Sequence, residues 1–113
     1  MARSDFNWMG VNQTFTQSNP TVTINFPIEG NAPPVDDAYL LITAHNVSHQ
    51  SHRILVNNQE LSGWDLPIHN PGWQTWMDRI QPGVLHTGNN TITIIRASND
   101  DFTVKDIVVN WRE

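Results

Sequence analysis

Cysteine is absent from this chain of 113 residues, which excludes disulfide bonds and thiolate metal sites. No stretch approaches the roughly 20 consecutive apolar residues that a membrane-spanning helix needs. The first eight residues, MARSDFNW, contain no apolar run, so they lack the central feature of a signal peptide. We therefore expect no membrane partner; the missing signal peptide implies a protein that is cytoplasmic as encoded, and the sequence leaves the compartment open.

Charge is also scarce, and most of it is negative. Charged residues make up 15% of the chain, where about 25% is usual, and the formal net charge is −5. The basic residues are scattered singly along the sequence: Arg3, Arg53, Arg79, Arg96, Lys105 and Arg112. Because a nucleic-acid backbone is bound by clustered cations, we expect no nucleic-acid partner.

Tryptophan is abundant instead, with five copies, and Pro and Gly recur at short intervals. Such frequent turn signals leave room for short strands rather than long helices. The length fits one domain over residues 1–113. We expect residues 1–20 to pack along this domain or on a partner chain, because they hold too many apolar side chains for a free tail: Phe6, Trp8, Met9, Val11 and Phe15.

The strand pattern is clearest at Thr21–Phe26, where apolar and polar residues alternate. A short strand is predicted at Val11–Gln17. The run AYLLITA at residues 38–44 predicts a strand that is buried on both faces. Thr91–Arg96 and Phe102–Trp111 are expected as the last two strands, joined by a hairpin loop.

The last of these strands carries a change of phase. Its apolar residues alternate as far as Val104 and resume one position late at Ile107, which predicts a β-bulge at Lys105-Asp106. The inward-facing set is then Phe102, Val104, Ile107, Val109 and Trp111.

Two segments, Arg53–Leu61 and Leu85–Ile95, place strand-forming residues beside consecutive asparagines. Asparagine tolerates the left-handed backbone that tight turns need. We therefore expect a turn at Asn57-Asn58 and another at residues 88–90, GNN. Together these patterns predict an all-β protein, an antiparallel β-sandwich.

The order of these segments, from about Ala38 to Arg112, resembles the galactose-binding-domain-like jelly roll, a fold of many carbohydrate-binding modules. The matching pieces are the hydrophobic strand Tyr39–Ile42, the segments Ile54–Leu61 and Leu85–Ile94, and Asp101–Val104 at the start of the last strand. The resemblance implies a jelly-roll sandwich. It also implies sugar binding in many members, protein interaction in others and enzyme chemistry in a few.

The stretch Gly63–Trp76 is rich in Pro, Gly and Trp, and we expect it to be an irregular loop. It combines flat aromatic rings, on which a sugar can stack, with short polar side chains that bond hydroxyl groups. Another arrangement leaves only Trp73 exposed, while Trp64 and Trp76 close the end of the sandwich. The predicted residues that bind a neutral carbohydrate, or another small neutral polar ligand, are Trp64, Asp65, His69, Asn70, Trp73, Gln74 and Trp76.

Two groups of side chains carry metal-binding atoms close together in the sequence: the histidines His45, His49 and His52, and the acidic pairs Asp36-Asp37 and Asp100-Asp101. The histidine spacing matches no established zinc pattern. The acidic pairs lack the dense carboxylate spacing of a calcium loop, and capping of turns is the simpler expectation. We therefore expect no cofactor, with a structural calcium ion as the alternative.

No nucleophile elbow, phosphate loop or dinucleotide fingerprint is present in the sequence. We therefore expect a non-catalytic, lectin-like carbohydrate-binding module. One alternative is a structural or protein-interaction module that self-associates into a homo-oligomer. A second alternative is a small enzyme with a His/Asp pocket at the loop end of the sandwich.

Overall fold

The computed structural model describes residues 4–29, 35–61 and 66–112, and every regular element in these ranges is a β-strand. The strands are β1 (Ser4–Phe15), β2 (Thr21–Ile28), β3 (Val35–Val47), β4 (Arg53–Val56), β5 (Gln59–Glu60), β6 (His69–Arg79), β7 (Gly88–Ile95) and β8 (Phe102–Arg112). The described ranges hold no helix long and apolar enough to cross a membrane.

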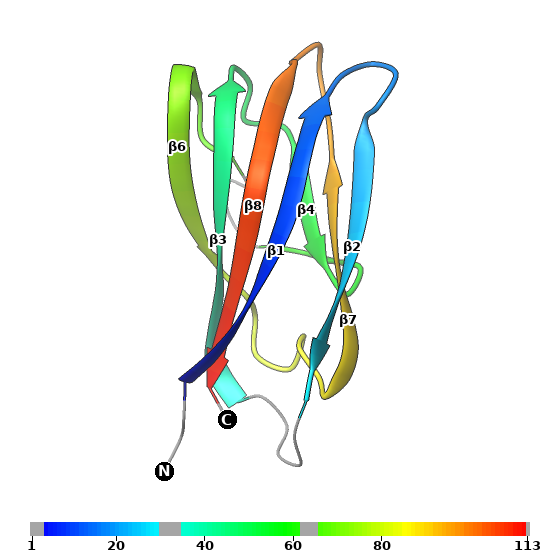
Figure 1. Cartoon of the computed structure of the whole chain (residues 1–113), viewed down its shortest axis with the longest axis vertical. Coiled ribbons are helices and arrows are strands. Elements are labelled where there is room, and N and C mark those ends of the chain that lie inside the picture. Colours follow the sequence, from blue (N-terminus) through cyan, green and yellow to red (C-terminus); the bar gives the residue numbers. More distant parts are fainter. Residues whose placement is uncertain (1–3, 30–34, 62–65, 113) are drawn as a thin grey trace.

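The strands form two antiparallel four-stranded sheets that pack as a sandwich, so the predicted all-β fold is confirmed. Sheet A has the order β1-β8-β3-β6, and sheet B has the order β2-β7-β4-β5. Figure 1 shows sheet A in front, with the loops that follow β1, β3 and β7 gathered at the upper end. We call this upper end the loop end.

The core lies between the sheets and is built by alternate residues of each strand. Phe15 and Phe102 stack at its loop end, with ring centroids 4.8 Å apart and planes 3° from parallel. In β2, Phe26 and Ile28 are buried while Thr21 and Pro27 are exposed, which confirms the predicted alternation. Burial of one face of each strand is what holds an antiparallel sandwich together.

The predicted bulge in β8 is present. Asp106 pairs with Thr43, and Val104 pairs with Ala44, so Lys105 between them has no counterpart in β3. All five residues of the predicted inward set are buried. Because of this extra residue, the apolar side chains that follow it again point toward the core.

Three sequence-based expectations about the strands need correction. The run at 38–44 is buried on one face only, because Ala38, Leu40, Ile42 and Ala44 are buried while the odd-numbered residues are half-exposed. The N-terminal strand begins at Ser4, well before Val11, as the edge of sheet A. The loop before Phe102 is no hairpin, since β7 lies in sheet B and β8 in sheet A.

The turn at Asn57-Asn58 is confirmed by two left-handed residues, with φ angles of 50° and 66°. The second predicted turn is wrong, because Asn90 pairs with Phe26 inside the β2–β7 ladder. Asn90 is fully buried, and it bonds Asn57 at 2.8 Å and both the amide and the carbonyl of His86. A buried asparagine with several hydrogen-bond partners has a structural role. In the sequence, such an asparagine looks the same as one in a turn.

The largest correction concerns the stretch expected as an irregular loop. Residues 69–76 begin β6, which pairs along its length with β3. Pro71 and Gly72 lie near the start of this strand, where an edge strand tolerates them. The alternation from Trp73 onward was a strand signal that the Pro and Gly punctuation obscured.

Replacement of Phe102 by Ala should remove the stacked ring at the centre of the loop-end core. We expect Phe102→Ala to lower the free energy of unfolding by about 3–5 kcal/mol, as for other buried aromatics. The control is Val108→Ala on the outer face of the same strand, with an expected loss of about 1 kcal/mol or less. Urea unfolding followed by tryptophan fluorescence measures both, and equal losses would contradict the assigned faces.

Candidate functional site

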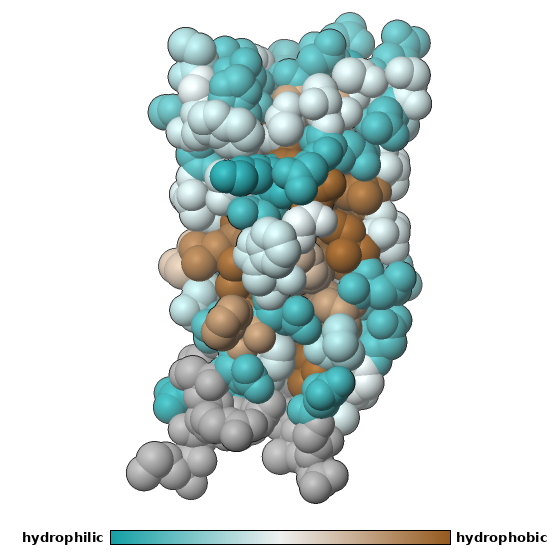
Figure 2. Space-filling model, viewed as in Figure 1, coloured by the Kyte–Doolittle hydropathy of each residue, from teal (hydrophilic) through white to brown (hydrophobic). Residues whose placement is uncertain are grey.

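The outer face of sheet A is unusually apolar for a surface in contact with water. Five large apolar side chains are exposed in the described ranges, and four of them lie on this face: Phe6 at 63%, Trp8 at 58%, Met77 at 57% and Trp73 at 52%. Figure 2 views this face and shows hydrophobic side chains gathered across its middle. We call it the apolar face.

The register of the strands arranges this face in rows. One row runs across all four strands and is apolar throughout: Trp8, Val108, Leu41 and Met77. The row on one side of it combines Phe6 and Tyr39 with polar neighbours. Neighbouring strands lie about 4.8 Å apart, so the side chains within a row touch one another.

The outer face of sheet B provides the contrast. Its exposed positions on β2 carry no large apolar side chain, and the Thr23 and Thr93 hydroxyls bond across the strands at 3.1 Å. An antiparallel sheet with one solvated face is expected to look like this. The two faces of the same sandwich therefore differ in what they can contact.

The ring of Trp8 is held in one position although it is exposed. Its Nε1–H donates to Asp106 Oδ2 at 3.3 Å. A Cβ atom added to Gly10 would lie 3.0 Å from the Trp8 ring, so the ring lies over this glycine. An exposed ring fixed in this way can be covered by a partner at little entropic cost.

Trp73 lies at the far edge of the same face. Its ring packs on His45, with centroids 4.5 Å apart and planes tilted by 35°. His45 and Trp73 are paired residues of β3 and β6. By strand spacing alone, about 14 Å separates the β1 and β6 edges, so Trp8 and Trp73 serve different parts of the face.

The residues predicted to bind a sugar are divided by the structure. Trp73 points outward and Trp76 inward, because they are an odd number of positions apart on one strand. Trp76 packs against the core, so these two rings cannot form one platform. Trp64 and Asp65 lie outside the described residues.

The polar members of the predicted set serve local contacts. Gln74 donates to the Pro67 carbonyl at 2.7 Å, and Asn70 donates to Ser48 Oγ at the loop end. His69 is exposed on β6. No common centre gathers the described members of this set.

The inner side of β6 carries two buried polar atoms without a hydrogen-bond partner in the described structure, Trp76 Nε1 and Asp78 Oδ2. Burial raises the pKa of Asp78, and the hydrogen bond from the Arg79 amide lowers it by less. A carboxyl group in this position weakens the packing of β6 at the edge of the sheet.

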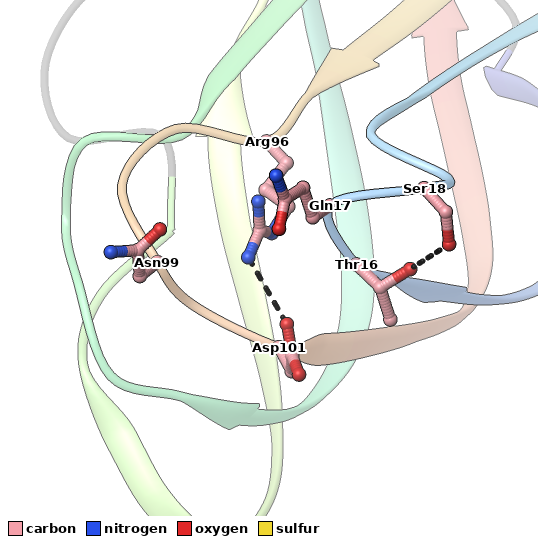
Figure 3. A pocket seen from close by; sticks show the side chains of 6 residues that line it. All are labelled: Thr16, Gln17, Ser18, Arg96, Asn99 and Asp101. Carbon is pink, nitrogen blue, oxygen red and sulfur yellow. Dashed lines mark hydrogen bonds and ion pairs between the residues drawn. The ribbon is translucent and has the colours of Figure 1, made fainter.

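The loop end carries an open polar groove of about 710 Å³, shown in Figure 3. Arg96 is fixed within it, since Nε donates to the Asp100 carbonyl at 2.8 Å and Nη2 to Asp101 Oδ1 at 3.1 Å. The charges of Arg96 and Asp101 offset each other. The side chains that line the groove are Thr16, Gln17, Ser18, Arg96, Asn99 and Asp101, none of which is aromatic.

A buried histidine–carboxylate pair includes Asp100, which lies between the groove residues Asn99 and Asp101 in the sequence. His52 and Asp100 are both about 2% exposed, and His52 Nε2 lies 2.6 Å from Asp100 Oδ2. The Ala97 amide donates to His52 Nδ1 at 3.0 Å, so Nε2 carries the proton and donates to the carboxylate. The backbone amides of Ser48 and His49 also donate to Asp100.

Both ring nitrogens of His52 are therefore occupied by the protein, and the ring also packs on Phe102. Burial lowers the pKa of His52. This effect outweighs the hydrogen bond and the charge of Asp100, which both raise the pKa. A general base needs a free nitrogen within reach of a substrate. The pair thus fixes the loops of the loop end and offers no nitrogen for catalysis.

The metal candidates are dispersed in the described structure. His45 faces outward beside Trp73, His49 is exposed, and His52 is buried. Asp36 and Asp37 lie in β3, and their side chains are outside the described ranges. Within those ranges, no three His, Asp or Glu side chains come together as a metal-binding group.

The chain belongs to the family of unknown function DUF7383, whose model matches residues 4–113. No curated protein matches the chain. Among solved structures, it is similar to the crystal structure of dimeric latent PorU from Porphyromonas gingivalis, with a TM-score of 0.74 and 11% identity. The match covers 99% of this chain and 13% of that one, and at this identity it shows the fold alone.

Sequence reasoning missed most of the apolar face. The sequence predicts that the segment with Phe6 and Trp8 packs along the domain or on a partner chain, but it does not indicate which face of a sheet these rings occupy. Met77 lay just beyond the expected loop. The signal was present in the alternation of Phe6, Trp8 and Gly10 on one strand, but only the cross-strand register brings Trp8 and Met77 into one row.

Stability should depend on pH through His52. The unfolded chain binds a proton near the ordinary histidine pKa of 6.5, and the folded chain only at lower pH. The contribution of neutral His52 to the free energy of unfolding is therefore complete above about pH 6.5 and is lost as the pH falls below this value. Urea unfolding between about pH 5 and 8 should show this slope in the wild type.

The variant His52→Gln should flatten that slope, while His86→Gln, which removes an exposed histidine that is not among the groups shifting the pKa of His52, should leave it unchanged. The same slope in the wild type and in His52→Gln would contradict the assignment to His52.

Proposed function

We propose that this domain is a non-catalytic protein-interaction module that self-associates through sheet A. The observation that carries the proposal is the apolar face, which holds four of the five large apolar side chains that are exposed among the described residues. Contiguous apolar surface on a soluble domain is typical of a contact with another macromolecule. Aromatic residues and methionine are also the side chains enriched at such contacts.

The surroundings of this face support a protein as its partner. Most neighbouring side chains in these rows are uncharged, including Thr43, Thr75 and Asn110. Arg79 and Asp106 are charged and of opposite sign, so burial would desolvate little net charge. The fixed ring of Trp8 resembles the preorganised aromatic anchors of protein interfaces. An enzyme is less well supported, because the buried His52–Asp100 pair has no free ring nitrogen.

Replacement of Met77 tests this proposal, because Met77 ends the apolar row. We expect the wild type to self-associate between about 1 µM and 1 mM, the range for interfaces of modest size. Met77→Ser should weaken association about tenfold, or ~1.4 kcal/mol. Ile68→Ser is the matched control, since Ile68 is equally exposed but lies outside the strands of sheet A.

Sedimentation velocity over this concentration range measures the association. A wild type that stays monomeric throughout, or an Ile68→Ser variant as impaired as Met77→Ser, would count against the proposal.

A second candidate is carbohydrate binding, which the resemblance to galactose-binding-like jelly rolls implies. One observation favours it on the apolar face. The half-exposed ring of Trp73 lies next to the hydroxyl of Thr75, at the same edge, which combines a stacking surface with a hydrogen-bonding group.

If sugars bind here, Trp73→Ala should abolish binding and Trp8→Ala should not, because Trp8 lies on the opposite edge of the sheet. A glycan array followed by calorimetry, with and without calcium, measures both variants. If the wild type binds no sugar with calcium and none without it, this candidate is excluded.

A further inference from the structure

Strand β6 is an edge of sheet A, and one side of its backbone has no partner strand in the part of the chain that the structure describes. Among the described strands it pairs with β3 alone. The amides of Gly72 and Ile80 both point toward β3, to Asn46 Oδ1 and to the Ala38 carbonyl. Because successive residues of a strand point their amides in opposite directions, the odd-numbered residues from 73 to 79 direct theirs toward the open edge.

The other edges in the described structure are closed or short. Side chains of β1 cap carbonyls of β2, since Asn7 donates to Pro27 at 3.0 Å and Gln13 to Thr21 at 3.4 Å. Strand β5 has only two residues. A long edge such as β6, which no described strand covers, is a template for another strand.

We propose that two copies of the chain pair their β6 strands antiparallel about a two-fold axis at Thr75. This inference rests on the proposed self-association and names its contact. In this register Thr75 faces Thr75 of the partner subunit, and Trp73 faces Met77 of the partner subunit. Two four-stranded sheets then join into one of eight strands.

The side chains of β6 are self-complementary in this register. Trp73 and Met77 are each more than half exposed and would cover one another across the axis. Thr–Thr pairs already link three pairs of neighbouring strands within the chain, at 3.0–3.3 Å. The apolar row that ends at Met77 continues onto Trp73 of the partner subunit.

Charge and proline placement favour this register over its neighbours. Arg79 faces Pro71 of the partner subunit and Asp78 faces Gly72 of the partner subunit, so no like charges meet although each chain carries −5. The axis at Thr75 leaves Pro71, which has no amide hydrogen, in the last pair of the ladder, whereas an axis at Trp73 places it opposite Thr75 inside the ladder and removes an internal bond. An axis at Met77 leaves Trp73 opposite the exposed Gln81 of the partner subunit.

A cysteine at the axis provides a direct test, because the chain has no cysteine of its own. Directly opposed residues in an antiparallel pair have Cα atoms about 5.5 Å apart, within the span of a disulfide. We expect Thr75→Cys to form a covalent dimer under mild oxidation at least tenfold faster than Thr14→Cys, a control on β1 of the same face. Equal rates would overturn the proposal.

A proline at the same position tests the backbone bonds. The amide of Thr75 points to the open edge, so Thr75→Pro removes a bond of the dimer and none of the β3 ladder. We expect Thr75→Pro to be monomeric with an unchanged circular dichroism spectrum, and Thr75→Val to dimerise like the wild type. If Thr75→Pro does not fold, the rate of disulfide formation by Thr75→Cys decides.

Trp8→Ser separates this inference from the proposed function. Pairing through β6 leaves Trp8 uncovered, so Trp8→Ser should dimerise like the wild type. If Trp8→Ser loses association and Thr75→Pro keeps it, the copies stack face to face, which overturns the pairing of β6 and keeps the proposed function. A wild type that is monomeric throughout overturns both.

Discussion

Both faces of sheet A depend on one constraint, namely which side chains of β8 point toward the core and which point outward. This strand pairs with β1 on one side and with β3 on the other, so its register fixes theirs. A slip of one residue in a strand moves every side chain to the opposite face of the sheet. The extra residue at Lys105 prevents this by keeping Phe102 and Val104, and then Ile107 and Val109, on the inner side.

Strand β1 follows the same irregularity. Its register with β8 shifts between Gly10 and Gln13, where Asn12 takes a left-handed backbone with a φ angle of 48°. The shift lets β1 pair with β8 on both sides of the extra residue, while alternation along β1 keeps Met9 and Phe15 facing the core and Phe6 and Trp8 facing outward. The apolar face is therefore a consequence of the same register that builds the core.

Two buried polar networks fix the ends of the sandwich. His52 and Asp100 tie the loops at the loop end, and Asn57 with Asn90 ties the β4–β5 turn to the start of β7. Each network is well supplied with partners, and such networks specify one arrangement of loops over others. Fixed loops hold Arg96 and its groove in place, but the groove lacks the apolar surface that the sheet provides.

The local patterns of the sequence were sufficient for much of the fold. Alternation predicted β2 and the inward set of β8, and the left-handed preference of asparagine predicted the turn at Asn57-Asn58. The same asparagine signal failed at Asn90, because a buried amide with several partners and a turn residue look alike in one dimension. The candidate site was harder, since Trp8 and Met77 are 69 positions apart and meet only through the pairing of β1, β8, β3 and β6.

The difference between the two outer faces argues that the apolar face is functional rather than incidental. Both sheets have the same number of described strands and share one core, so the fold alone predicts a solvated outer face on each sheet. Sheet B has that exterior, with threonines bonded across β2 and β7. Sheet A instead places an unbroken apolar row across its middle and fixes the Trp8 ring with Asp106. A side chain needed only for folding would point inward, so the outward row is the kind of surface that makes contact with another chain.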